Sequence, residues 1–322
     1  MRYLISLILV TCIVLPAACS APAVPTPATP AALTSSVAAP TVTVSIIAPI
    51  ATPLYRAKLG TVERDITYCT NDGIALKMDV HYPRAMSKPA PVAVYVHGGS
   101  WSSGSKSDSM GMTDVPELLA RGYLVASVDY RYAPEWKFPA QIHDVKCAIR
   151  FLRANAAQFN LDPDRIGAWG HSAGGHLVAL LGTTDKRDGV EGSGEYSDQS
   201  SRVQAAVDMC GRADLHGMPA DKAKSVFGAP NDASDILDNA SPIKFVSKDD
   251  SPFLILHGDG DTMVPLRVSQ MLTERLQAVG VPVTLVVVRN ADHSFNPEGG
   301  PMSPTRAEMT QIIADFFDQY LR

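Results

Sequence analysis

A G-x-S-x-G pentapeptide at 170–174 constrains the fold of this chain more than any other feature of its sequence. The apolar segment before it, 165–169, is typical of a short strand, and the segment after it, 175–181, is typical of the start of a helix. A strand, a tight turn and a helix are the context in which this motif raises a serine hydroxyl above the edge of a sheet. Gly170 and Gly174 leave room for the strained backbone of such a turn. We therefore interpret Ser172 as a nucleophile; the alternative is a close contact between a helix and a strand.

Strand-like and helix-like segments alternate along the rest of the chain from residue 56. The Asp72-Gly73 pair between the first two strands is a hairpin signal. The alternation predicts right-handed crossovers and a doubly wound, mostly parallel sheet of eight strands, with an irregular cap or lid insertion at 214–250. We predict strands at 63–69, 75–82, 92–96, 123–129, 165–169, 203–209, 253–256 and 283–288, and helices at 114–121, 139–159, from 175, 266–279 and 303–321.

The first 55 residues have a different composition. An apolar run at 4–15 follows Arg2 and is typical of a secretory signal, being shorter than a membrane span. Residues 15–19 resemble a bacterial lipobox, so we expect segment 1–19 to be a signal with lipidation at Cys19; the alternative is cleavage near Ala21 and free secretion. Segment 20–55 has seven prolines and no charged residue, which indicates an extended tether. Both alternatives predict an exported protein, either anchored to the cell envelope by lipid or secreted.

The cysteines give no pattern that predicts a disulfide framework. Cys12 and Cys19 belong to the N-terminal segment, which leaves Cys69, Cys147 and Cys210, an odd number without metal-binding spacing. Cys147 falls on the buried face of a predicted helix and is expected to act as a small hydrophobic side chain.

The charge balance restricts the partners. The net charge is −5, and no Lys/Arg cluster is present, so we expect no nucleic-acid partner. Hydrophobic residues make up 46% of the chain, enough for a large core in the domain at 56–322. We expect no metal and no cofactor.

A serine nucleophile needs a base and an acid that orients the base. Enzymes in which this motif lies on a turn from a strand to a helix order them as serine, acid, histidine. Seven of the eight histidines precede the candidate acids in the segment after the seventh predicted strand. Only His293 lies downstream of them, in the loop after the last predicted strand. The loop after the preceding strand offers Asp259 and Asp261. We choose Asp261, because the glycine-bearing turn lets it reach the sheet edge, and expect Asp259 to cap that turn; Asp292 is expected to point away from the ring.

The oxyanion of the reaction needs backbone N–H donors. The His-Gly-Gly-Ser-Trp segment at 97–101 follows a buried strand, and its glycines allow the backbone to approach a substrate closely. Ala173 follows the nucleophile and adds an amide at a helix N-terminus.

These motifs together resemble the α/β-hydrolase esterases, in the bacterial carboxylesterase and feruloyl-esterase-like branch related to hormone-sensitive lipase. The resemblance runs from about residue 62 to the C-terminus and is carried by 97–101, 129–135, 138–140, 170–175 and 257–265. It implies a triad of Ser172, Asp261 and His293, and an oxyanion hole from the amides of Gly99, Ser100 and Ala173. Ser100 replaces the third glycine of the usual HGGG motif. Residues 129–135 and Asp144, and likewise His171 and His176, are expected to be structural.

We therefore expect a serine carboxylesterase that works through an acyl-enzyme on short-acyl esters, with acetyl or feruloyl groups on polysaccharide as candidates. Its partner would be a small-molecule or polysaccharide ester, and it would meet a membrane only through the N-terminal lipid. The alternatives are an arylformamidase-like amidase and a non-catalytic binding module on the same scaffold.

Overall fold

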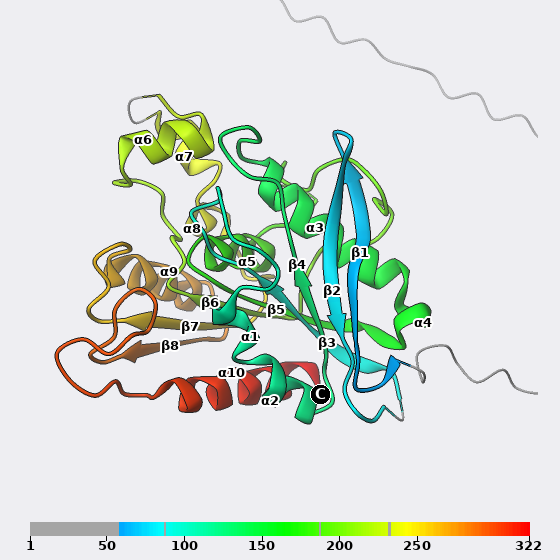
Figure 1. Ribbon diagram of the computed structural model, residues 1–322. Coiled ribbons are helices and arrows are strands. Elements are labelled where there is room, and N and C mark those ends of the chain that lie inside the picture. The colour runs from blue at the N-terminus through cyan, green and yellow to red at the C-terminus, as the bar shows by residue number, and fades with distance from the viewer. Residues whose placement is uncertain (1–57, 87, 187, 231–232) are drawn as a thin grey trace, which may run out of the picture. The chain divides into compact units, whose positions relative to one another are not determined.

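One eight-stranded sheet forms the centre of the described part of the chain, which in this computed structural model comprises residues 58–86, 88–186, 188–230 and 233–322. The strand order is β1-β2-β4-β3-β5-β6-β7-β8. β2 pairs antiparallel with β1 and β4, and all other neighbours are parallel, which confirms the predicted sheet (Figure 1). The strands are β1 (Val62–Asn71), β2 (Ile74–His81), β3 (Ala90–Val96), β4 (Leu124–Val128), β5 (Leu161–His171), β6 (Ala205–Met209), β7 (Phe253–Gly258) and β8 (Val283–Val288).

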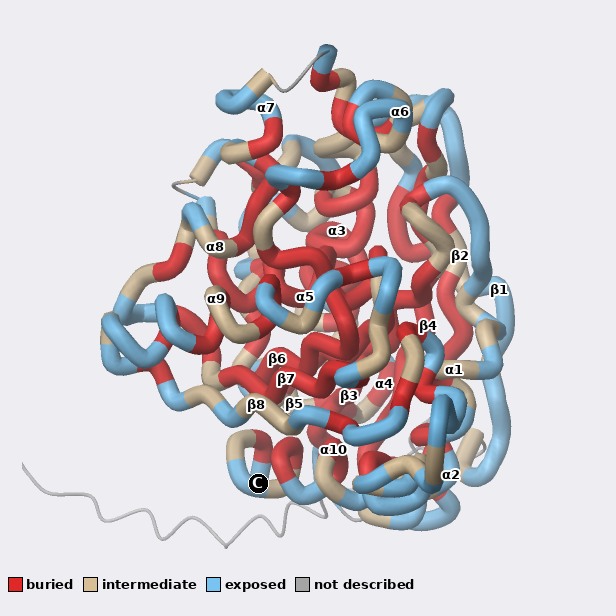
Figure 2. The backbone as a smooth tube through the Cα atoms, turned by 90° about the vertical axis from the view of Figure 1, so that its left-hand side faces the viewer, coloured by how far each residue is buried: buried red, intermediate tan, exposed pale blue. Residues whose placement is uncertain are grey.

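The central strands are buried on both faces of the sheet. Along β3, Val92 and Val94 belong to one core cluster, whereas Ala93 and Tyr95 belong to a second cluster. Consecutive strand side chains point to opposite faces, so the two clusters lie on the two sides of the sheet. The unbroken apolar runs of these strands follow from this two-sided burial, and Figure 2 shows the central strands in the buried colour.

Helices form a layer on each face. Leu152 of α3, Leu177 of α5 and Leu272 of α9 belong to the first cluster, and Leu118 of α2 and Phe317 of α10 belong to the second. Accordingly α3, α5 and α9 cover one face, and α2 and α10 lie together on the other (Figure 1). The helices are α1 (Ser109–Met112), α2 (Val115–Ala120), α3 (Ala140–Ala154), α4 (Ala156–Phe159), α5 (Ala173–Thr183), α6 (Ala220–Lys222), the π-helical η2 (Ala223–Phe227), α7 (Ser234–Asp238), α8 (Pro242–Phe245), α9 (Leu266–Ala278) and α10 (Arg306–Leu321).

The segment between β6 and β7 differs from the regular crossovers. It contains only short helical pieces, α6, η2, α7 and α8, within the stretch 214–250 predicted to be a cap. Phe227, Leu237 and Ala240 nevertheless join the first core cluster, so this segment is packed onto the domain.

Two local predictions had different outcomes. The hairpin is confirmed: β1 and β2 pair through a turn at Asp72 and Gly73, both with positive φ. The single helix predicted at 139–159 is wrong, because Asn155 leaves the helical backbone (φ −104°, ψ 23°) and its side chain donates to the Phe151 carbonyl at 2.8 Å. An asparagine that hydrogen-bonds the backbone locally competes with helix continuation.

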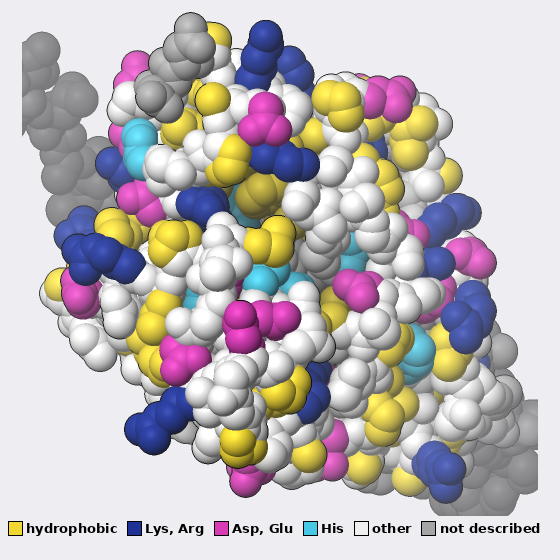
Figure 3. Space-filling model, turned by 60° about the vertical axis from the view of Figure 1, so that its left-hand side comes forward, with side chains coloured by type: hydrophobic (Ala, Val, Ile, Leu, Met, Phe, Trp, Pro, Cys, Tyr) yellow, Lys and Arg dark blue, Asp and Glu magenta, His cyan; other side chains and the backbone are white. Residues whose placement is uncertain are grey.

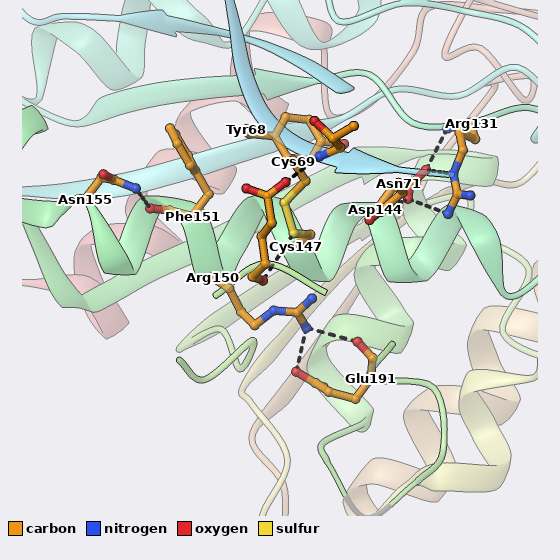
Figure 4. The surroundings of a disulfide bond; sticks show 12 residues. Tyr68, Cys69, Asn71, Arg131, Asp144, Cys147, Arg150, Phe151, Asn155 and Glu191 are labelled. Atoms are coloured by element: carbon orange, nitrogen blue, oxygen red, sulfur yellow. Dashed lines mark hydrogen bonds and ion pairs between the residues drawn. A yellow bond between two sulfur atoms is a disulfide. The ribbon is translucent and has the colours of Figure 1, made fainter. Parts of the chain in front are cut away.

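A disulfide joins Cys69 of β1 to Cys147 of α3, which corrects the expectation of no disulfide framework and of Cys147 as a plain hydrophobic side chain (Figure 4). Both are buried, and α3 packs against β1. The helical pattern identified Cys147 as buried, but it carried no information on which strand covers α3. Cys210 is free and buried.

Arg131 and Asp144 anchor the loop beside this disulfide (Figure 4). Nε and Nη2 of Arg131 donate to the two carboxylate oxygens of Asp144, each at 2.8 Å, and Asn71 donates to the same carboxylate at 2.6 Å. These contacts confirm the structural role expected for Asp144 and for this part of segment 129–135.

The predictions for segments 1–19 and 20–55, including lipidation of Cys19, lie outside the described residues. Among the residues that are described, no helix has both the length and the apolar character needed to cross a membrane.

Candidate active site

Ser172 occupies the sharp turn between β5 and α5. Its φ is 57° and its ψ is −116°, a left-handed backbone conformation that is strained for a residue with a side chain. The Ser172 amide donates to the Met209 carbonyl at 2.8 Å, which ties the turn to β6. A Cβ on Gly170 would lie 2.6 Å from the Gly174 backbone, and one on Gly174 would lie 2.0 Å from the Val96 carbonyl oxygen. Both glycines are therefore required by close backbone contacts.

The structure brings Ser172, His293 and Asp261 together in one line of hydrogen bonds. Nε2 of His293 lies 2.9 Å from the Ser172 hydroxyl oxygen. Nδ1 of the same ring lies 2.7 Å from Oδ2 of Asp261. With Nδ1 protonated toward the carboxylate, Nε2 is free to accept the serine proton, so the arrangement suits a general base.

The Asp261 carboxylate is fully buried and has a hydrogen-bond donor on each side. Its Oδ1 accepts the amides of Met263 and Val264, both at 2.8 Å, and Nε2 of His257 lies 3.2 Å from Oδ2. Burial alone raises the pKa of Asp261, but the hydrogen bonds from His257, His293 and the Val264 amide outweigh it and hold the pKa far below the usual range. The group is therefore a permanent anion facing His293.

The neighbouring carboxylates do not reach the His293 ring. Asp292 accepts the amides of Ser294 and Asn296, each at 2.8 Å, and so closes its own loop. Asp259 is exposed. Asp259 was expected to cap the glycine-bearing turn, but Asp261 caps it instead. Oδ1 of Asp261 accepts the turn amide of Val264, and Oδ2 of the same carboxylate contacts His293.

His171 has the structural role expected for it, and its partner is the base His293, which the sequence did not reveal. Its Nε2 donates to the His293 carbonyl at 2.7 Å, and the two rings lie 5.0 Å apart. Burial lowers the pKa of His171 to about 4, so the ring is neutral at pH 7. Its position directly before Ser172 was the only signal in the sequence.

The predicted oxyanion hole is brought together in part. Ser100 and Ala173 line a pocket beside Ser172, whereas Gly99 does not line it. The Ala173 amide is at the first position of α5, where an N–H has no acceptor within the helix. Gly99 has φ 109°, and a Cβ there would lie 2.0 Å from the Ser103 carbonyl oxygen, so it shapes the loop that presents Ser100.

Trp101 and His176 connect this loop to segment 214–250. Nε1 of Trp101 donates to Nδ1 of His176 at 3.1 Å, and Nε2 of His176 donates to the Ala240 carbonyl at 2.8 Å. Burial lowers the pKa of His176 to about 4, which keeps one neutral tautomer with both nitrogens used. His176 therefore has the structural role expected for it, with partners that the sequence did not reveal.

The pocket at Ser172 has a volume of about 300 Å³. On the face drawn in Figure 3, histidine side chains are visible near the centre, with hydrophobic side chains beside them and Lys and Arg side chains above. The lining combines the reactive groups with apolar and cationic side chains: Ser100, Trp101, Ser172, Ala173, Arg212, Met218, Pro219, Lys222, Thr262, Met263, Val264 and His293.

Two triplets of side chains within the described residues have ligand atoms close enough together to hold a metal ion. They are His171, Cys210 and His293, and Cys210, His257 and Asp261. The histidines and Asp261 already hydrogen-bond within the network around Ser172, and burial raises the pKa of the Cys210 thiol. We assign no metal to them, and the absence of a metal and a cofactor stays a prediction.

Residues 78–276 match the model of a protein family described as BD-FAE. Esterase LipC of Mycobacterium tuberculosis is 34% identical over 264 residues, covering 78% of this chain and 64% of LipC. The carboxylic ester hydrolase named LipM of the same organism is 32% identical over 71% of this chain and 54% of its own length. The chain thus spans between about half and two thirds of the length of these two relatives.

Solved structures of proteins titled as esterases are also similar to this chain. A truncated carbohydrate esterase from gut microbiota is 30% identical, with a TM-score of 0.68 over 82% of this chain and 97% of that protein. A bifunctional GH43-CE protein of Bacteroides eggerthii is 32% identical, with a TM-score of 0.71 over 81% of this chain and 38% of that protein. Butyrate-bound esterase 2 of Thermogutta terrifontis is 25% identical, with a TM-score of 0.67 over 80% and 92% of the two chains.

Proposed function

The chain belongs to the BD-FAE family and has the α/β-hydrolase fold, and on this premise we propose that it is a serine carboxylesterase. The observation that carries the proposal is the line of hydrogen bonds from Asp261 through His293 to Ser172, which ends at a pocket. The similarity to proteins named esterases supports it. A binding module without chemistry would not need a buried carboxylate aligned with a histidine and a strained serine.

The reaction follows from the geometry. Ser172 attacks the ester carbonyl carbon while its proton passes to Nε2 of His293, and Asp261 stabilises the imidazolium that forms. The backbone amides of Ala173 and Ser100 stabilise the negative charge that develops on the carbonyl oxygen of the ester. Gly99 shapes the loop that presents Ser100. His293 then gives the proton to the departing alcohol, which leaves an acyl-serine. A water molecule attacks this acyl group, His293 takes its proton, and the carboxylic acid is released as Ser172 is restored.

The substrate class is proposed to be small-molecule or carbohydrate esters with a short acyl group, with acetyl and feruloyl groups on polysaccharide as candidates. The pocket volume of about 300 Å³ supports a small acyl group. The neighbours titled as carbohydrate esterases and the butyrate-bound esterase support the same range.

We also propose that the enzyme works outside the cytoplasm, with segment 1–19 as its signal and 20–55 as a tether. The Cys69–Cys147 disulfide supports this, because such bonds persist in oxidising compartments. Metabolic labelling with palmitate tests the anchor: label is expected in the wild type and lost in Cys19→Ala, and an unlabelled wild type would remove the anchor.

The activity is tested by comparing kcat/KM for p-nitrophenyl acetate, methyl ferulate, acetylated xylan and N-formylkynurenine. We expect turnover of the esters above that of the formamide, and loss of turnover in Ser172→Ala. Faster cleavage of N-formylkynurenine would favour the amidase instead. Equal ester turnover in Ser172→Ala would remove the serine mechanism.

A further inference from the structure

Arg212 is a buried cation in the wall of the pocket at Ser172. The residue is only 9% exposed, and it lies in the loop that follows β6, three residues after Met209. Its Nη2 donates to the Met263 carbonyl at 3.0 Å. Among the described residues no carboxylate oxygen lies within 4.0 Å of the guanidinium, although an arginine offers five N–H donors.

A buried charge without a direct partner is costly, so this position requires an explanation. Burial lowers the pKa of Arg212, and attraction from Asp261 and Asp214 offsets this only partly. Asp261 directs its two oxygens to the turn amides and the two histidines. Asp214 accepts the His216 amide at 3.0 Å. The remaining guanidinium donors are thus left to a group that enters the pocket.

Lys222 of segment 214–250 adds a second cation to the same pocket. It lies on α6, is half-buried, and has no ion-pair partner within the described residues. Met218 and Met263 supply apolar lining beside the two cations. The lining therefore suits a ligand with an apolar body and a negatively charged end.

We propose that this pocket selects esters that carry a carboxylate elsewhere in the molecule, with Arg212 as the principal partner of that carboxylate and Lys222 as a second one. The proposal rests on the proposed function, because the scissile ester must lie at Ser172. Both cations and Ser172 line a single pocket of about 300 Å³, so one small substrate spans them. Arginine is suited to the role, since its planar guanidinium binds a carboxylate through two parallel hydrogen bonds.

The test uses two pairs of esters that differ in charge but hardly in shape. In 3-acetoxybenzoate and 3-acetoxybenzamide the carboxylate or its neutral amide lies in the alcohol part; in monoethyl succinate and ethyl succinamate it lies in the acyl part. The readout is the ratio of kcat/KM for the anionic ester to that for its neutral partner. Comparing this ratio between a variant and the wild type cancels the difference in intrinsic reactivity between the esters.

Arg212→Gln is expected to lower this ratio by about 10- to 100-fold in at least one pair, the usual worth of a charge-assisted hydrogen bond. Lys222→Met is expected to lower it by about 3- to 10-fold, and it keeps the test independent of the folding of the Arg212 variant. Lys224→Met is the matched control, because Lys224 is exposed, lies two residues away and does not line the pocket.

Ratios that stay within about twofold of the wild type in both pairs and in both pocket variants, with the neutral esters still hydrolysed, would overturn the carboxylate subsite and leave the esterase function intact. A ratio that falls equally in Lys224→Met would also overturn it, because the effect would then be one of general surface charge. A wild type that hydrolyses none of the four esters but does hydrolyse p-nitrophenyl acetate would overturn the subsite alone. A wild type that hydrolyses neither the four esters nor p-nitrophenyl acetate would overturn the proposed function, and the subsite with it.

Discussion

Asp261 differs from Asp259 and Asp292 in what its two oxygens contact, and this difference decides which carboxylate serves His293. Oδ1 is held by the amides of its own turn, which fixes the direction of Oδ2 toward the histidine. A carboxylate fixed in this way needs no reorganisation when the imidazolium forms. The turn and the acid are therefore one structural unit.

Replacing Asp261 with asparagine is expected to lower kcat for p-nitrophenyl acetate by about 10³- to 10⁴-fold, because an amide would stabilise the wrong histidine tautomer. Asp259→Asn is the matched control, since Asp259 is exposed in the same turn, and its kcat is expected to stay within about threefold of the wild type. A larger loss in Asp259→Asn than in Asp261→Asn would reassign the acid.

At the scale of residues, the sequence predicted the catalytic residues that a motif or their order along the chain identifies. It did not predict contacts between residues that are far apart in the chain. Ser172 and His293 follow from a motif and from elimination among the histidines. The support that His171 gives to the His293 carbonyl, and that His176 gives to the Ala240 carbonyl, joins residues 122 and 64 positions apart. No local pattern encodes such partners, and the same holds for Arg212.

At the scale of elements, the disulfide fastens the N-terminal strand to the helical layer. Within the described residues β1 is an edge strand that pairs only with β2, so its attachment otherwise depends on this hairpin partner and on packing against α3. The bond closes a loop of 78 residues. Closing a loop of this size in the unfolded chain is worth about 4.5 kcal/mol in the chain-entropy description.

Removing both cysteines, as Cys69→Ala with Cys147→Ala, is expected to lower the free energy of unfolding by about 2–5 kcal/mol. Activity at 25 °C is expected to remain, because neither cysteine lines the pocket at Ser172. Denaturant unfolding with and without a reducing agent measures this: the reductant should weaken the wild type and leave the double variant unchanged. An equal response of both proteins would contradict the stabilising role.

The strands and helices were predictable because each carries a local pattern of its own, such as the unbroken apolar run of β3, which follows from burial on both faces of the sheet. The prediction failed where a single side chain overrides the pattern, as Asn155 does between α3 and α4. The loop at 97–104 also lay beyond the pattern, because Ser100 and Trp101 adopt positive φ in a turn that only its surroundings stabilise.

At the scale of the whole molecule, buried titratable groups make the free energy of unfolding of the domain depend on pH. His171 and His176 are held neutral by burial, with pKa values lowered to about 4. Burial acts in the opposite direction on Asp208 and Asp250, and raises the pKa of each to about 6. The two pairs of groups therefore oppose each other as the pH falls.

For His176 the sign follows from the unfolded chain, which binds the proton near pH 6.5, well before the folded protein does near pH 4. The stability that the neutral ring contributes is complete above pH 6.5 and is lost as the pH falls toward 4. At pH 5 this loss is about 2 kcal/mol. In His176→Gln the loss is absent, so the difference in unfolding free energy between wild type and variant should narrow by about 2 kcal/mol from pH 7.5 to pH 5.

Urea unfolding at the two pH values measures this difference, in which the contributions of Asp208 and Asp250 cancel because both proteins contain them. A difference that does not change with pH would show that His176 is not held neutral by burial.

The proposed mechanism requires Ser172 to be the group that forms the acyl-enzyme, and covalent labelling tests this most directly. An organophosphate such as paraoxon transfers one diethylphosphoryl group to an activated serine. Intact-mass and peptide analysis of the labelled protein should find a single adduct at Ser172, formed in parallel with the loss of esterase activity, and none in Ser172→Ala. Full activity after complete labelling, or an adduct at another residue that accounts for the loss, would contradict the account.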